Sequence, residues 1–208
     1  MAHPVIASVT RYWDTLRDAR LVPLREEIDP RAIQPALSYA FILARPRPGT
    51  VRFRLSGTHL NDVMGMEARG MPVRAICDVP HRRRFMEHVE RVFETPSALE
   101  VDLRADRGRG HILRGKMSLL PLRSSAGEID RALGIVVTEG AVLQPPVRFV
   151  PRGFAVTPLR AGRPLDEGRR DLYPAGLHED ASVFHPAPAT PARAEGGPIL
   201  RVLDGGKP

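Results

Sequence analysis

The chain has 208 residues and a formal net charge of +7, and arginine supplies most of the positive charge because Lys116 and Lys207 are the only lysines. No apolar run approaches the roughly 20 residues that a bilayer-spanning helix needs, and the single cysteine, Cys77, excludes an intramolecular disulfide. The N-terminus has neither the basic nor the apolar region of a secretory signal, so we expect a cytoplasmic protein.

Residues 5–20 predict an amphipathic helix that precedes the main domain, within a segment that we place at 1–22. Its apolar side chains recur at helical spacing and form one stripe. The stripe must be buried, either on the sheet of its own chain or against the same helix of a second copy. The second alternative makes it a candidate homodimer interface, formed by Val5, Val9, Tyr12, Trp13 and Leu16.

The main domain is predicted to span 23–143 and to begin with an irregular, proline-containing connection. Residues 39–44 then form an apolar strand, and residues 46–49 have the composition of a turn. Residues 51–56 alternate between apolar and polar side chains, which is typical of a strand with one buried face. Together these segments predict a β-hairpin.

Two helices are predicted after the hairpin. The first has Thr58 as a suitable N-cap and ends at Gly65, where a left-handed residue is expected. An irregular stretch with at most one helical turn follows. Residues 81–93 then place their apolar side chains on one face and their charged side chains mostly opposite, which predicts the second helix.

Three further strands are predicted at 99–104, 113–122 and 132–138. Short hairpin loops join them, so we expect antiparallel neighbours. From residue 144 the composition changes, because eleven of the last 65 residues are proline and eight are glycine. Such a composition without a repeat predicts that 144–208 is a mostly disordered tail. The alternative is that its short apolar segments, such as 148–159 and 199–203, dock on the domain or on a partner.

Several short segments of the chain resemble a family of small bacterial proteins that have one PAS-like domain and no output domain. The resemblance covers about residues 8–140. It implies an α+β fold, in which a five-stranded antiparallel sheet has helices over one face. It also implies regulatory work through protein contacts, without known catalytic residues. The segments are YWDTLR at 12–17, PLREEIDP at 23–30, RFRLSGTHL at 52–60, MGMEARGMPV at 64–73 and LGIVV at 133–137.

The PAS-like resemblance further implies that a small apolar ligand can lie between the sheet and its helices. Eight apolar side chains of the predicted strands and helices are candidates for the wall of such a pocket. The alternative for each of them is ordinary core packing. The candidates are Phe41, Phe53, Leu55, Leu60, Met64, Phe85, Val89 and Ile135.

No cofactor is expected. Cys77 lies in RAICDVP, which lacks the Asn-Cys-Arg-Phe-Leu-Gln run of flavin photoreceptors, and a buried small hydrophobe explains it better. His81 and His88 belong to the second helix, where a cap or surface position explains them better than a heme ligand. The histidines show no metal-ligand spacing, and the chain has no recognised catalytic motif, so neither a metal site nor an enzyme is expected.

The arginine excess reflects either the codon usage of a GC-rich genome or an anionic partner. Its even spread favours codon usage, and the arginines around residues 104–114 lack interleaved aromatic side chains, so nucleic-acid binding is not expected. The interpretation is a cytoplasmic sensory or regulatory protein, homodimeric, that binds proteins of a signalling pathway and takes a small-molecule ligand. The alternative is an interaction adaptor with a filled core and no ligand.

Overall fold

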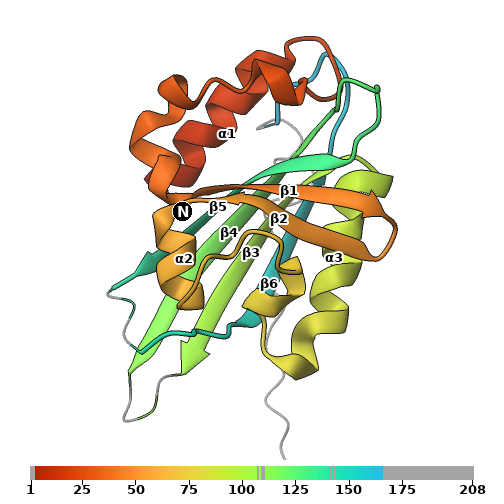
Figure 1. Cartoon of the computed structure of the whole chain (residues 1–208). Coiled ribbons are helices and arrows are strands. Elements are labelled where there is room, and N and C mark those ends of the chain that lie inside the picture. The colour runs from red at the N-terminus through yellow and green to blue at the C-terminus, as the bar shows by residue number, and fades with distance from the viewer. Residues whose placement is uncertain (1–2, 107, 109–110, 141, 143, 166–208) are drawn as a thin grey trace, which may run out of the picture. The chain divides into compact units, whose positions relative to one another are not determined.

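A six-stranded antiparallel sheet forms the centre of the protein, with strand order β2-β1-β5-β4-β3-β6 (Figure 1). The computed structural model describes residues 3–106, 108, 111–140, 142 and 144–165. Within them, every helix is too short or too polar to cross a membrane. The strands are β1 Ala40–Arg47, β2 Thr50–Ser56, β3 Ser97–Asp106, β4 Ile112–Leu122, β5 Arg131–Glu139 and β6 Val150–Pro158.

Helices cover both faces of the sheet. The face predicted to carry helices holds α2 (Thr58–Met64), η3 (Val73–Ile76) and α3 (Arg82–Glu94), whose buried side chains form one apolar cluster with the strands. The opposite face holds α1 (Pro4–Arg17) and the 3₁₀ helix η2 (Pro30–Tyr39), which form a second cluster. Two shorter 3₁₀ turns are η1 (Arg25–Glu27) and η4 (Val79–His81).

Strand β5 shows why two clusters exist. Its side chains alternate between the faces, so that Val136 packs with α2 and α3 while Ile135 and Val137 pack with α1 and η2. The strand is therefore apolar on both sides, as expected for the middle of a covered sheet. The N-terminal stripe thus packs on the sheet of its own chain, which was one of the two alternatives for it.

The predicted hairpin and both helices after it are confirmed, with one correction. Gly65 ends α2 in the left-handed conformation, with φ of 70°. Thr58, however, is the first residue of α2 and not its cap, so that prediction was wrong. Gly57 is the N-cap, and a Cβ there would lie 2.4 Å from the carbonyl oxygen of Ser38. The end of η2 lies so close to the backbone at position 57 that only glycine fits there.

The prediction of a disordered tail from residue 144 was wrong for its first part. Val147 and Phe149 are fully buried, and β6 pairs with β3 along its length, so the sheet has six strands and not five. Pro151 and Pro158 do not prevent this, because β6 is an edge strand and needs ladder hydrogen bonds on one side only. The rest of the predicted tail, 166–208, lies outside the described residues.

Candidate functional site

The space between the sheet and the helices α2 and α3 is filled by apolar side chains. Six of the eight pocket candidates lie there, each at most 1% exposed. Phe41 and Phe53 meet edge to face with 5.3 Å between their ring centroids. This packing is the ordinary core that the sequence offered as the alternative to a pocket. The six are Phe41, Phe53, Leu60, Met64, Phe85 and Val89.

The other two candidates lie elsewhere. Ile135 is buried on the opposite face, among the side chains of α1 and η2. Leu55 is 48% exposed, although it has the same parity along β2 as the buried Phe53. The pairing of β1 with β2 shifts register between Ile42 and Leu43, and the shift places Leu55 opposite Ile42. A bulge of this kind turns the following side chains to the other face, and the alternation within one strand cannot predict it.

A cavity of about 200 Å³ lies between η2 and the β1–β2 end of the sheet, and we call it the η2 cavity. Its wall is mostly apolar, and Leu37, one of the lining residues, is 39% exposed. Two pocket candidates, Phe41 and Leu55, line it. The full lining is Arg25, Ile28, Pro30, Ile33, Leu37, Ala40, Phe41, Ile42, Leu55, Ser56, Gly57 and Leu133.

The predicted dimer stripe divides into a buried and a half-buried part. Val9 and Trp13 are buried within the chain, and the Trp13 indole N–H donates to the carbonyl of Pro121 at 3.0 Å. Val5, Tyr12 and Leu16 are half-buried against the same cluster. In this structure the buried pair therefore packs on the sheet of its own chain.

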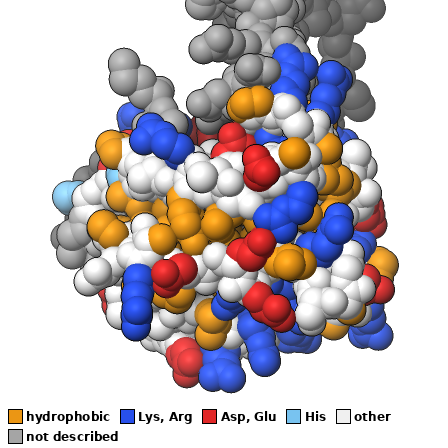
Figure 2. Space-filling model, turned by 90° about the horizontal axis from the view of Figure 1, so that it is seen from above, with side chains coloured by type: hydrophobic (Ala, Val, Ile, Leu, Met, Phe, Trp, Pro, Cys, Tyr) orange, Lys and Arg blue, Asp and Glu red, His pale blue; other side chains and the backbone are white. Residues whose placement is uncertain are grey.

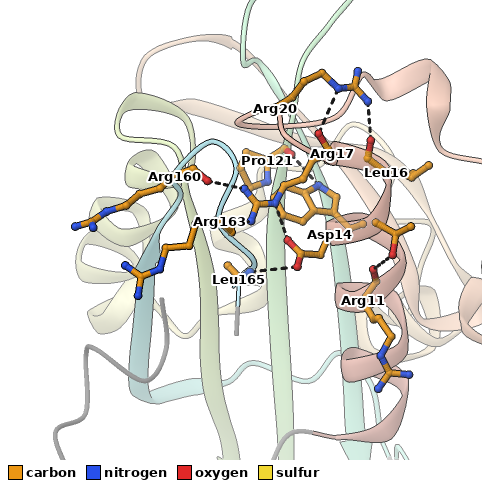
Figure 3. Close-up of polar contacts among 11 residues, drawn as sticks. Arg11, Asp14, Leu16, Arg17, Arg20, Pro121, Arg160, Arg163 and Leu165 are labelled. Atoms are coloured by element: carbon orange, nitrogen blue, oxygen red, sulfur yellow. Dashed lines mark hydrogen bonds and ion pairs between the residues drawn. The ribbon is translucent and has the colours of Figure 1, made fainter. Parts of the chain in front are cut away.

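Arg17 continues the stripe one turn beyond Trp13 and holds the segment after β6 against α1 (Figure 3). Arg17 is 1% exposed, and its guanidinium bonds Asp14 Oδ1 at 2.6 Å and donates to the carbonyls of Arg160 and Arg163. Asp14 Oδ2 accepts from the backbone N–H of Leu165 at 3.1 Å. Sequence reasoning missed this contact, although the position of Arg17 on the apolar stripe was a usable signal.

The residues considered for cofactors lie as follows. Cys77 is fully buried, and burial raises the pKa of its thiol to about 12. His81 bonds the carboxylate of Asp78 at 2.7 Å, and the His88 ring stacks on Phe154 with 3.9 Å between centroids. Asp78 is not part of the core cluster, and Phe154 is half-buried and packs against it.

A wider concavity of about 810 Å³ lies beside α2 and the end of β5. Its lining is polar and includes His59, Asp62 and Glu67. His59 is half-buried, its Nε2 lies 3.2 Å from the Thr138 hydroxyl, and burial lowers the pKa of its imidazole. The η2 cavity is the more enclosed and more apolar of the two, and suits a small ligand better.

Comparison with known proteins gives one family. The PAS domain pattern matches residues 1–137, from α1 into β5, so β6 lies beyond it. Similar solved structures include a light-oxygen-voltage domain studied with a flavin analogue, 18% identical, covering 53% of this chain and 83% of that one, with a TM-score of 0.41.

Two further structures share this level of similarity. The PAS domain of a Colwellia psychrerythraea protein is 16% identical, covering 52% of this chain and 95% of that one, with a TM-score of 0.39. A sensory box histidine kinase/response regulator from Burkholderia thailandensis is 18% identical, covering 53% of this chain and 84% of that one, with a TM-score of 0.35. None of the curated proteins matches the chain.

Proposed function

Because the chain belongs to the PAS domain family, whose domains serve sensory and regulatory roles, we propose that it is a cytoplasmic regulatory protein that binds partner proteins and senses a small apolar molecule. The observation that carries this proposal is the η2 cavity. A cavity of about 150 Å³ lined by Leu, Ile and Phe is large enough to hold benzene. The η2 cavity, at about 200 Å³ and with a similar lining, is suited to a ligand of that size or slightly larger.

The ligand would act by biasing how η2 packs on the sheet. The 3₁₀ helix is irregular at Ile33, where φ is −114°, and it contains Pro35. Ile33 lines the cavity on one side and belongs to the cluster that includes α1 on the other. A molecule that prefers one packing of η2 shifts the population toward that packing, by as much as its affinity differs between the two.

Partner contacts belong to the exposed surface. Figure 2 shows the face seen from above Figure 1, with hydrophobic side chains near its centre and charged side chains around them. Leu37 and Leu55 are exposed beside the cavity, so a partner that contacts them would respond to its occupancy. The proposal includes a homodimer, but the contact must use side chains other than Val9 and Trp13.

The second candidate function is the ligand-free adaptor. The filled core between the sheet and α2 and α3 favours it, because those side chains leave the usual layer between sheet and helices occupied. Such a protein would bind partners with one fixed surface. Whether a ligand occupies the η2 cavity distinguishes the sensory protein from the ligand-free adaptor.

The test is ligand occupancy of the η2 cavity. Native mass spectrometry of the purified protein, followed by calorimetric titration with benzyl alcohol, is expected to detect binding in the wild type. Ala40→Leu, which fills the cavity, is expected to abolish it. Thr15→Leu adds a similar side chain to an exposed position of α1 and serves as the control. If the wild type shows neither a bound mass nor a titration signal, the ligand-sensing function is contradicted and the ligand-free adaptor is favoured.

A further inference from the structure

One charged side chain lines the η2 cavity. Arg25 stands among eleven uncharged lining residues, and Ser56 supplies the one side-chain hydroxyl. The backbone of Arg25 is held in place, since its N–H donates to the carbonyl of Arg123 at 2.8 Å. Arg25 is a half-buried residue, and the other residues around the cavity are mostly apolar.

Within the described residues, the guanidinium of Arg25 has no carboxylate partner. The neighbouring acidic groups are engaged elsewhere or face solvent. Glu27 bonds Arg20 at 2.9 Å and the backbone N–H of Leu24 at 2.7 Å, and the hydrogen bond from Arg20 lowers the pKa of Glu27. Asp29 accepts from the backbone N–H of Arg31 at 2.9 Å, and Glu26 is exposed.

A half-buried arginine without a carboxylate partner is well suited to bind a carboxylate from outside. Arginine presents paired N–H donors that match the two oxygens of a carboxylate, and such charge-assisted bonds are stronger than neutral ones. An anion with an apolar body would also bury that body against Ile33, Ala40 and Leu133. A neutral molecule of the same shape would gain only the second contribution.

We propose that the η2 cavity binds small apolar carboxylates, with Arg25 holding the carboxylate at the opening and the apolar body lying between η2 and the sheet. This rests on the proposed function, because it names the ligand class for the same cavity. The volume of about 200 Å³ suits a body of one aromatic ring. Longer molecules would extend past the exposed Leu37 and Leu55.

Calorimetric titration of the full chain with benzoate and with benzamide, its uncharged near-isostere, tests the proposal. We expect the wild type to bind benzoate about tenfold more tightly than benzamide, as a bond to a charged group implies. Arg25→Gln is expected to lose that preference and to keep benzamide binding unchanged. Arg25→Lys keeps the charge without the paired donors and is expected to retain part of the preference.

Arg31→Gln is the matched control, because Arg31 is an exposed arginine of η2 that does not line the cavity. It is expected to retain the full benzoate preference. Equal affinity of the wild type for benzoate and benzamide would overturn the carboxylate assignment and leave the cavity as a neutral ligand site. Equal loss of preference in both glutamine variants would also overturn it, since the effect would then come from net charge. Absence of binding by either compound would overturn the ligand-sensing function as well.

Discussion

Single residues decide how closely the layers of this protein approach one another. Gly134 lies opposite Phe41 on the neighbouring strand, and a Cβ on Gly134 would lie 2.0 Å from Cε2 of the phenylalanine ring. The ring can lie across β5 only because that position has no side chain. Phe41 was predictable as a buried residue, but its pairing with Gly134 was not, because the two strands lie far apart in the chain.

Cys77 is the residue for which we expect a pH effect on stability. Burial raises its pKa above the ordinary value of about 9, to about 12. Between these values the unfolded chain loses the thiol proton and the folded chain keeps it, so the free energy of unfolding decreases as the pH rises. The contribution of the protonated Cys77 thiol to the free energy of unfolding is complete below a pH of about 9, and it is lost as the pH rises toward about 12.

The measurement is urea unfolding of the wild type and of Cys77→Ala at several pH values between about 8 and about 10.5. The variant removes the thiol, so other titrating groups cancel in the difference. We expect the stability advantage of the wild type to shrink by up to about 1.4 kcal/mol per pH unit above the ordinary thiol pKa. An advantage that stays constant across this range would contradict the burial of the thiol.

At the scale of elements, β6 shows how composition can hide a strand. Proline and glycine dominate the average over the last part of the chain, yet Val147, Phe149 and the strand after them are a local exception. The strand is stabilised by pairing with β3 and by Arg17 and Asp14, which together bond residues 160, 163 and 165 to α1. These partners lie more than a hundred residues away or on another strand, and an average over a window does not register them.

Two phenylalanines of this segment give a matched test of its packing. Phe149 is fully buried in the core, whereas Phe154 is half-buried and stacks on His88 at the surface. Phe149→Ala is expected to lower the free energy of unfolding by about 3–5 kcal/mol, as for other core phenylalanines. Phe154→Ala is expected to cost about 1 kcal/mol. Urea unfolding checks both values, and a negligible loss for Phe149→Ala would show that the segment does not pack on the sheet.

For the described domain as a whole, α1 and η2 turn a one-sided sheet into a sheet covered on both faces. The helix stripe alone was compatible with burial on this sheet or on a second copy. The indole of Trp13 and the guanidinium of Arg17, 5.4 Å from the indole centroid, belong to the packing within the chain. In any homodimer of this protein, the second copy would therefore contact the helices or the sheet edges, because helices already cover both faces of the sheet.

Substitutions in α1 separate packing within the chain from contact between copies. Trp13→Ala is expected to lower the free energy of unfolding by about 3–5 kcal/mol, because it removes a fully buried side chain. Val5→Asp changes a half-buried residue in the first turn of α1, where a carboxylate is favourable, and is expected to change stability little. Sedimentation equilibrium gives the mass of each variant. A Trp13→Ala protein with unchanged stability and a lower mass would show that the stripe binds a second copy instead.

The sequence by itself determined the elements whose signals are local. The alternation and the helical stripes predicted the hairpin, α1, α2, α3 and the three strands after them, because side-chain periodicity depends on a few neighbouring residues. Only the tertiary structure decided which face Leu55 takes, that β6 completes the sheet, and that Arg25 is the one charged residue among those that line the η2 cavity. Register shifts, edge pairing and cavities arise from contacts between segments far apart in the chain, and no local pattern specifies those contacts.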